Sequence, residues 1–182
     1  KNLIASGTGT TSERETDPVF KKGESDYSIV AGINNKSTDW QSSAFGYGNK
    51  AQGENSSAFG FENIASGINS SAFGYKTTAS GKRSAAFGLS NRAEGNDSFA
   101  FGRGNIAKNQ DSFAFGFDNK AYGKHSSAFG YDNETYGENT SAFGFRSRVD
   151  GNNSSAFGYE ISVSDNRNFN NARTVRINAS SV

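Results

Sequence analysis

The sequence contains no cysteine, a single proline and a single histidine among its 182 residues. Without cysteine, the chain has no disulfide framework and no thiol chemistry. No stretch approaches the roughly 18 consecutive apolar residues of a transmembrane helix. The lone histidine, His125, follows Lys124 in a predicted turn, and no Ser-His-Asp set or paired carboxylates accompany it. These absences predict a protein with no catalytic residues, no metal site and no cofactor.

Large apolar residues are also few, since Leu, Ile, Val and Phe together number 32 of 182. Such a composition usually indicates disorder. Here, however, the net charge is only +1, and the Phe residues recur periodically. The 19 basic and 18 acidic residues are interspersed, which predicts no nucleic-acid or anionic-membrane partner. A folded chain of this composition has to build its core largely from Ala and Gly.

A Phe-Gly pair recurs with a strict 14-residue period in nine copies, from Phe45-Gly46 to Phe157-Gly158. A degenerate tenth copy, at 30–33, lies one period before the first. Fixed-period similarity is typical of repeat proteins, in which each unit buries its apolar surface against its neighbours. The repeat therefore predicts one continuous domain.

Each repeat divides into two equal halves, as residues 56–69 illustrate with Ala-x-Gly in both halves. Two Gly per repeat, with abundant Asn and Ser, disfavour a helix. Such a half-repeat suits a strand of about five residues followed by a tight turn, for which Asn and Gly are favoured. The predicted fold is all-β: a β-solenoid of 14-residue coils, each with two strands and two turns.

Strand alternation assigns the two faces of each coil. Ala58 and Gly60 share one face of the first strand, whereas Phe59 and Phe61 share the other. Only small residues occur on both strands, so we expect them to face each other inside the coil. The alternative places Phe inside and Ala outside. That arrangement is disfavoured because no large side chain of the second strand would face the Phe residues.

The outward aromatics form a stripe too large to leave exposed on a monomer, so we expect identical chains to cover it in a rotationally symmetric oligomer. Arg103 interrupts one aromatic column, either to bind an anion or to lean outward. The predicted trimer interface comprises Phe45, Phe59, Phe61, Phe73, Phe87, Phe99, Phe101, Phe113, Phe115, Phe117, Phe129, Phe143, Phe145 and Phe157.

The outer face of the second strand is polar and is expected to face water. Tyr122 and Tyr136 interrupt it one coil apart, which predicts a separation of about 5 Å. Stacked exposed Tyr is common at binding surfaces. We predict a partner-binding role for the pair, and a ladder that only stabilises the roll is the alternative.

The repeat does not extend to either end of the sequence. Residues 1–22 are expected to form an N-terminal cap with an insertion at 8–22, which either covers the first coil or contacts a receptor. The roll is expected to span 23–165. Residues 166–182 lack the repeat and are interpreted as a C-terminal cap or the start of a neck.

The hexapeptide Asn-Ser-Ser-Ala-Phe-Gly occurs at 55–60, 69–74 and 153–158. It resembles the Asn-Ser-Val-Ala-Ile-Gly motif of YadA-type trimeric autotransporter heads, and the Ala-x-Gly that follows matches that family's second half-repeat. The resemblance covers roughly residues 23–165. Ser and Phe stand where the family prefers Val and Ile, a difference that concerns the interface packing and not the fold.

The resemblance implies a left-handed parallel β-roll, homotrimeric, at the tip of a fibre on a Gram-negative outer membrane. The implied activity is adhesion, not catalysis. The Phe-rich, Asn/Lys/Ser-rich composition is also similar to that of a fusobacterial adhesin, so the implied partner is a CEACAM-like host surface glycoprotein or a matrix protein. Membrane attachment is expected only through a C-terminal anchor outside this sequence. The alternative function is a non-binding spacer of a surface fibre, whose coils should be interchangeable.

Overall fold

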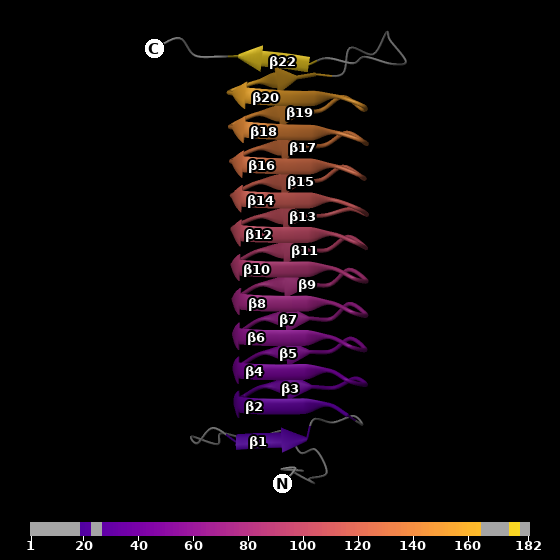
Figure 1. The fold of residues 1–182 in the computed structure, drawn as a ribbon, viewed down its shortest axis with the longest axis vertical. Coiled ribbons are helices and arrows are strands. Elements are labelled where there is room, and N and C mark those ends of the chain that lie inside the picture. The colour runs from indigo at the N-terminus through magenta and orange to yellow at the C-terminus, as the bar shows by residue number, and fades with distance from the viewer. Residues whose placement is uncertain (1–18, 23–26, 165–174, 179–182) are drawn as a thin grey trace.

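The computed structural model describes residues 27–164, together with the strands at 19–22 and 175–178. The chain winds into a straight column of coils in which a long strand alternates with a short one (Figure 1). The long strands are β2 (Ile29–Ile33), β4 (Ser43–Tyr47), β6 (Ser57–Phe61), β8 (Ser71–Tyr75), β10 (Ala85–Leu89), β12 (Phe99–Arg103), β14 (Phe113–Phe117), β16 (Ser127–Tyr131), β18 (Ser141–Phe145) and β20 (Ser155–Tyr159). The short strands are β3 (Lys36–Ser37), β5 (Lys50–Ala51), β7 (Ile64–Ala65), β9 (Thr78–Ala79), β11 (Arg92–Ala93), β13 (Ile106–Ala107), β15 (Lys120–Ala121), β17 (Glu134–Thr135), β19 (Arg148–Val149) and β21 (Ser162–Val163).

The long strands pair in parallel into one sheet and the short strands into a second. Pairing joins positions one repeat apart, as in Phe59 to Phe73 and Gly60 to Gly74. The degenerate copy follows the same register, with Ala31 opposite Phe45. Each side chain therefore lies beside its equivalent in the next coil. The predicted all-β solenoid of 14-residue coils is confirmed.

Both ends of the long-strand sheet carry an additional strand (Figure 1). β1 (Val19–Lys22) pairs antiparallel with β2, and β22 (Val175–Asn178) pairs in parallel with β20. The remainder of the 8–22 insertion and of the 166–182 tail lies outside the described residues.

Small residues fill the interior, as the alternation predicts. The Ala residues at the inner positions of the coils from β4 onward, such as Ala58 and Ala65, are buried with almost no exposed surface. The inner position becomes larger near the C-terminal end, where the short strands carry Thr135, Val149 and Val163 in place of Ala. The Phe of every Phe-Gly pair lies on the outside of the roll, so the alternative with Phe inside is wrong.

Two details of the predicted coil are wrong. The second strand is much shorter than expected, as β7 shows with only Ile64 and Ala65, and a connection at 66–70 follows it. The Gly of the Phe-Gly pair also does not face the interior, since Gly60 is exposed. Gly60 has φ of +116°, and a Cβ there would lie 2.1 Å from the carbonyl oxygen of Gly74. The backbone therefore bends at this residue, and only Gly fits there.

A ladder of buried Asn side chains runs along the corner where each long strand turns into a short one. The Nδ2 of Asn119 donates to the Phe115 carbonyl at 2.9 Å and to the Gly130 carbonyl at 2.7 Å. Its Oδ1 accepts from the backbone N–H of Asn133 at 3.1 Å and the Nδ2 of Asn133 at 3.0 Å. Equivalent bonds recur along much of the roll, with Thr77 and Ser147 replacing Asn in two coils. These amides donate to backbone carbonyls at the corner and connect each coil to the next.

Candidate interaction surfaces

The outward face of the long-strand sheet carries a ladder formed by the Phe of each Phe-Gly pair, which we call the Phe-Gly ladder. Neighbouring rings stack in parallel, with centroids 4.7 Å apart for Phe45 and Phe59 and 4.8 Å for Phe59 and Phe73. The rings are only partly covered, and Phe101 and Phe115 are 49% and 48% exposed. Parallel pairing with a 14-residue period produces this stacking, because it places each Phe directly above the previous one.

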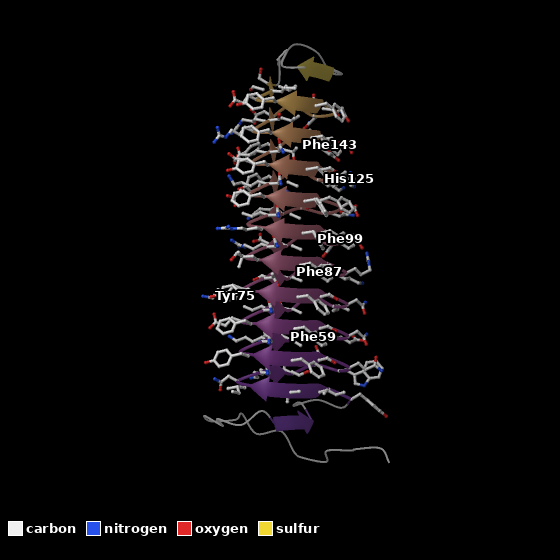
Figure 2. All side chains as sticks on the ribbon, turned by 60° about the vertical axis from the view of Figure 1, so that its left-hand side comes forward. Phe59, Tyr75, Phe87, Phe99, His125 and Phe143 are labelled. Atoms are coloured by element: carbon white, nitrogen blue, oxygen red, sulfur yellow. The ribbon has the colours of Figure 1, made fainter. Side chains whose placement is uncertain are left out.

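A second ladder follows the residue after each Phe-Gly pair, and we call it the Tyr ladder. Tyr47, Phe61 and Tyr75 stack at 5.0 Å per step. A second run stacks at 4.9 to 5.0 Å through Phe117, Tyr131, Phe145 and Tyr159. Figure 2 shows Phe59, Phe87, Phe99 and Phe143 on one side of the column of long strands and Tyr75 on the other. The predicted single stripe is thus two ladders at opposite margins of one sheet.

All of the Phe residues predicted for the interface lie on these outward positions. Phe99 and Phe113 extend the sheet's aromatic surface in a column that is otherwise mostly Ser. Their rings stack at 5.4 Å and are 45% and 39% exposed. Arg103 leans over the ring of Phe117, with its guanidinium carbon 5.2 Å from the ring centroid. Arg103 therefore stacks on the next residue of its own ladder, and its two predicted roles stay predictions.

The outward face of the short-strand sheet is polar and varied. Tyr122 and Tyr136 lie side by side with ring centroids 5.1 Å apart and planes inclined by 34°, which confirms the predicted spacing. Tyr136 is 40% exposed, and the Arg148 guanidinium carbon lies 4.3 Å from its ring centroid. The two rings and the guanidinium form a continuous platform, which we call the Tyr122–Tyr136 platform.

Charged side chains hold this platform in place. Lys120 Nζ donates to Glu134 Oε1 at 2.6 Å, and the hydroxyl of Tyr136 donates to Glu134 Oε2 at 3.0 Å. Arg148 also reaches Glu134, at 3.2 Å, and pairs with Asp150 at 2.9 Å. Burial opposes ionisation of Glu134, but the bonds from Lys120 and Tyr136 outweigh it and lower the pKa of the carboxyl. Burial and the bond to Glu134 raise the pKa of Tyr136. The platform therefore rests on a pre-ordered cluster of ionised groups.

Sequence reasoning missed this charged cluster and the buried Asn ladder. The cluster arises because Lys120, Glu134 and Arg148 occupy one column in successive coils. The Asn ladder carried a signal in its own recurrence, since Asn stands one repeat apart at 49 and 63 and again from 91 to 133.

His125 lies in the turn before β16, on the same side of the column as Phe99 (Figure 2). Its Nε2 lies 3.2 Å from Asp111 Oδ2 and its Nδ1 lies 3.2 Å from Asn139 Oδ1. Within the described residues, no three His, Cys, Asp or Glu side chains gather as a metal-binding group. The described part of the chain also includes no helix of the length and apolarity needed to span a membrane.

Comparison with known protein families identifies the repeats. The family model for the YadA head domain repeat (two copies) matches residues 41–63, 65–91, 79–105, 107–133 and 136–160, which together make up more than half of the chain. The chain belongs to the YadA head family. A search of curated protein sequences found no match.

Membership explains the uniform coils and their outward apolar surface. YadA-type heads are segments of trimeric autotransporter adhesins, which are anchored in the outer membrane and exposed at the cell surface. The chain is therefore an adhesin-type segment with a β-roll fold. Its family consists of adhesins and not of enzymes.

Proposed function

We propose that this head assembles as a homotrimer through its long-strand sheet and binds a host protein through its short-strand sheet. The observation that carries the proposal is the contrast between the two outward faces. One face presents continuous apolar ladders of partly exposed rings. The other presents mostly charged and polar side chains, and the Tyr122–Tyr136 platform is a pair of stacked aromatic rings on it.

The aromatic surface is large enough to require a cover. A Phe or Tyr side chain offers about 150–250 Å², so a ring that is about 40% exposed presents roughly 60–100 Å² of it. Eleven Phe and Tyr rings on this face are 36–51% exposed. Together they offer on the order of 800 Å² per chain, which is comparable to the ~800 Å² that each partner contributes to a standard interface. A second copy is the partner whose rings have the same spacing.

The positions of the two ladders favour a cyclic assembly. In a ring of identical chains, each chain contacts its two neighbours through two different surfaces. The Phe-Gly ladder and the Tyr ladder lie at opposite margins of the sheet (Figure 2). Each chain can thus pack the Phe-Gly ladder against the Tyr ladder of the next chain, and three chains close the ring. The short-strand sheets then remain on the outside.

The Tyr122–Tyr136 platform is the proposed contact for the host protein. Its rings and the Arg148 guanidinium belong to the residue types most common at energetically dominant contacts. Hydrogen bonds and ion pairs already fix the platform, so little conformational entropy is lost when a partner binds. A protein partner at the host cell surface, either a CEACAM-like glycoprotein or a matrix protein, fits a polar surface with one rigid aromatic centre.

The test replaces Tyr122 and Tyr136 with Ser, which stands in the same column at Ser66 and Ser80. A control carries Gln52→Ser and Lys108→Ser, the same change at two other coils of that column. Light scattering should show trimers for both variants, because neither change touches the aromatic ladders. Binding to host cells, an immobilised CEACAM-family ectodomain or matrix proteins should fall about 10-fold or more for the Tyr variant only.

Two results count against this proposal. Equal binding by the Tyr variant and the control would place the contact away from the platform. A wild-type trimer that binds neither host cells nor matrix proteins would favour the spacer function, in which the head only extends the fibre.

A further inference from the structure

The two ends of the roll are places where a second molecule could continue the fold. In the described part of the chain, the long-strand sheet ends with β1 on one side and with β22 on the other (Figure 1). An edge strand carries backbone N–H and C=O groups that can pair with a strand of another molecule. In repeat proteins the terminal units normally differ from the others and prevent such stacking. The residues of β1 and β22 therefore decide whether the roll can be extended.

The innermost position of the long strands changes character at these two strands. This position, which we call the inner column, holds a buried Ala in every coil from Ala44 to Ala156. On β2 it holds Val30, which packs against the Ala core. Residues paired across neighbouring strands share a face of the sheet. The pairing continues the inner column to Lys21 of β1, opposite Val30, and to Arg176 of β22, beside Ala156. The column of small residues thus ends on a basic residue at both ends.

A general rise in polarity toward the ends does not account for this change. The column of the Phe-Gly ladder stays apolar, because Ile177 of β22 lies beside Phe157. At the other end, Phe20 of β1 lies opposite Ala31, which holds the Phe position in the degenerate copy. The change from a small apolar residue to a basic one therefore distinguishes the inner column from the Phe-Gly column.

The short-strand sheet stops before the long-strand sheet does. Among the described residues it runs from β3 to β21, so that neither β1 nor β22 has a short strand in its own coil. The inner column is enclosed between two sheets only from β2 to β20. A charged residue on β1 or β22 is therefore compatible with contact to water, whereas a charge farther along the column would be buried among Ala residues.

Stacking of two rolls end to end would remove this contact with water. A second roll that extends the sheet covers the terminal position of the inner column, and burying a charge without an opposite partner is costly. The second roll also contributes its own basic residue, either Lys21 or Arg176. Every combination of two ends therefore places two positive charges next to each other in one column. Like charges on paired strands destabilise the pairing.

We propose that Lys21 and Arg176 keep each head a single roll, because they make its two ends mutually repulsive. Charged residues on the inner face of an edge strand protect sheets from edge-to-edge association in this way. The inference goes beyond the proposed function and does not depend on the trimer, since it concerns contacts along the axis of the roll and not contacts between its sides.

The first test removes both charges. The end variant carries Lys21→Ala and Arg176→Ala, which extend the Ala column to both terminal strands. The control carries Lys22→Ala and Lys50→Ala, an equal loss of charge away from the inner column. Lys22 pairs with Ile29 in another column of the sheet, and Lys50 is exposed on the short-strand sheet. Sedimentation measures the mass of each protein, and electron microscopy measures the length of the particles.

We expect the end variant to associate into columns longer than one roll, with an average mass about twofold or more above that of the wild type at equal concentration. The control should match the wild type in both mass and length. An end variant that keeps the wild-type mass and length overturns the proposal. A wild-type protein that already forms columns longer than one roll overturns it as well.

The second test changes the sign of the charges, so that each inner column still ends on charged residues. Arg176→Glu brings a carboxylate to Lys21 wherever the C-terminal end of one roll meets the N-terminal end of another. We expect this variant to form longer columns that shorten as salt is added. Lys21→Glu with Arg176→Glu makes both ends acidic and should restore single rolls.

The comparison of these two acidic variants also covers loss of folding in the end variant. If the end variant precipitates without forming longer columns, the acidic variants decide the question. Longer columns for Arg176→Glu alone support the proposal, and equal masses for the two acidic variants overturn it.

Discussion

The two sheets of this roll share one backbone period but carry opposite kinds of surface. Along the long-strand sheet, the Phe of the Phe-Gly pair never changes in nine coils. Along the short-strand sheet, the outward columns change from coil to coil, as Lys120, Glu134 and Arg148 show. The repeating surface of the long-strand sheet suits a partner with the same repeat, such as another copy of the chain. The varied surface of the short-strand sheet suits a partner that does not repeat, because each of its coils presents different side chains.

The residues expected to stabilise the roll are also different from those expected to bind partners. The buried Ala residues and the Asn ladder lie between the sheets and belong to both. The aromatic ladders and the Tyr122–Tyr136 platform lie outside and can change without altering the interior. Substitutions in the interior, on the aromatic ladders and on the Tyr122–Tyr136 platform are therefore expected to have effects of different kinds and sizes.

The largest effect is expected on the aromatic face. Phe115→Asp places a carboxylate without a partner in the proposed interface, which costs several kcal/mol for each chain. We expect the trimer to dissociate at micromolar concentration, as measured by light scattering or sedimentation. Gln52→Asp makes a similar charge change on the other sheet and should leave the trimer intact. Equal behaviour of the two variants would show that the long-strand sheet is not the assembly surface.

An intermediate effect is expected at the corner that both sheets share. Asn119→Ala removes donors to the carbonyls of Phe115 and Gly130. Losing these two part-buried bonds is expected to cost about 1–3 kcal/mol, measured by thermal or denaturant unfolding.

Asn119→Thr provides the matched control for this position. Thr77 occupies the same column naturally, and its backbone N–H and hydroxyl both donate to Asn63 Oδ1. The Thr variant keeps the link to the preceding coil, so its loss of stability should be smaller. A loss equal to that of Asn119→Ala would mean that the carbonyl contacts alone account for the stabilisation.

The smallest effect is expected on the polar face and depends on pH. Because the pKa of Glu134 is lowered in the folded protein, its stabilising contribution is present above the unfolded pKa, near 4.5. That contribution is lost as the pH falls through the folded-state pKa. Glu134→Gln should lower the melting temperature by about 1–3 °C at neutral pH, as for other partly exposed ion pairs.

The same variant should match the wild type in acid, where the carboxyl of Glu134 is protonated. Melting curves of the two proteins across this pH range check the expectation. A difference that persists unchanged in strong acid would show that packing, and not charge, carries the effect.

The sequence predicted the coil, its period and its inner and outer faces because these depend only on spacing. A 14-residue repeat with parallel pairing places Ala58 beside Ala72 and Phe59 beside Phe73 whatever the details of the turns. The unequal strand lengths could not be read in the same way. They depend on where the backbone bends, and at Gly60 the φ of +116° and the nearness of the Gly74 carbonyl appear only in the folded structure.

By itself, the sequence determined that this chain is a β-roll with small residues inside and aromatic residues outside. Periodicity suffices for this, because each residue's environment repeats with the chain. Only the tertiary structure decided how the outward residues are grouped. It separated the aromatics into two ladders at opposite margins, turned the Asn column into a buried ladder, and joined Glu134 to Lys120, Tyr136 and Arg148. These groupings depend on the direction of side chains at the corners, where positive φ angles end the simple alternation along a strand.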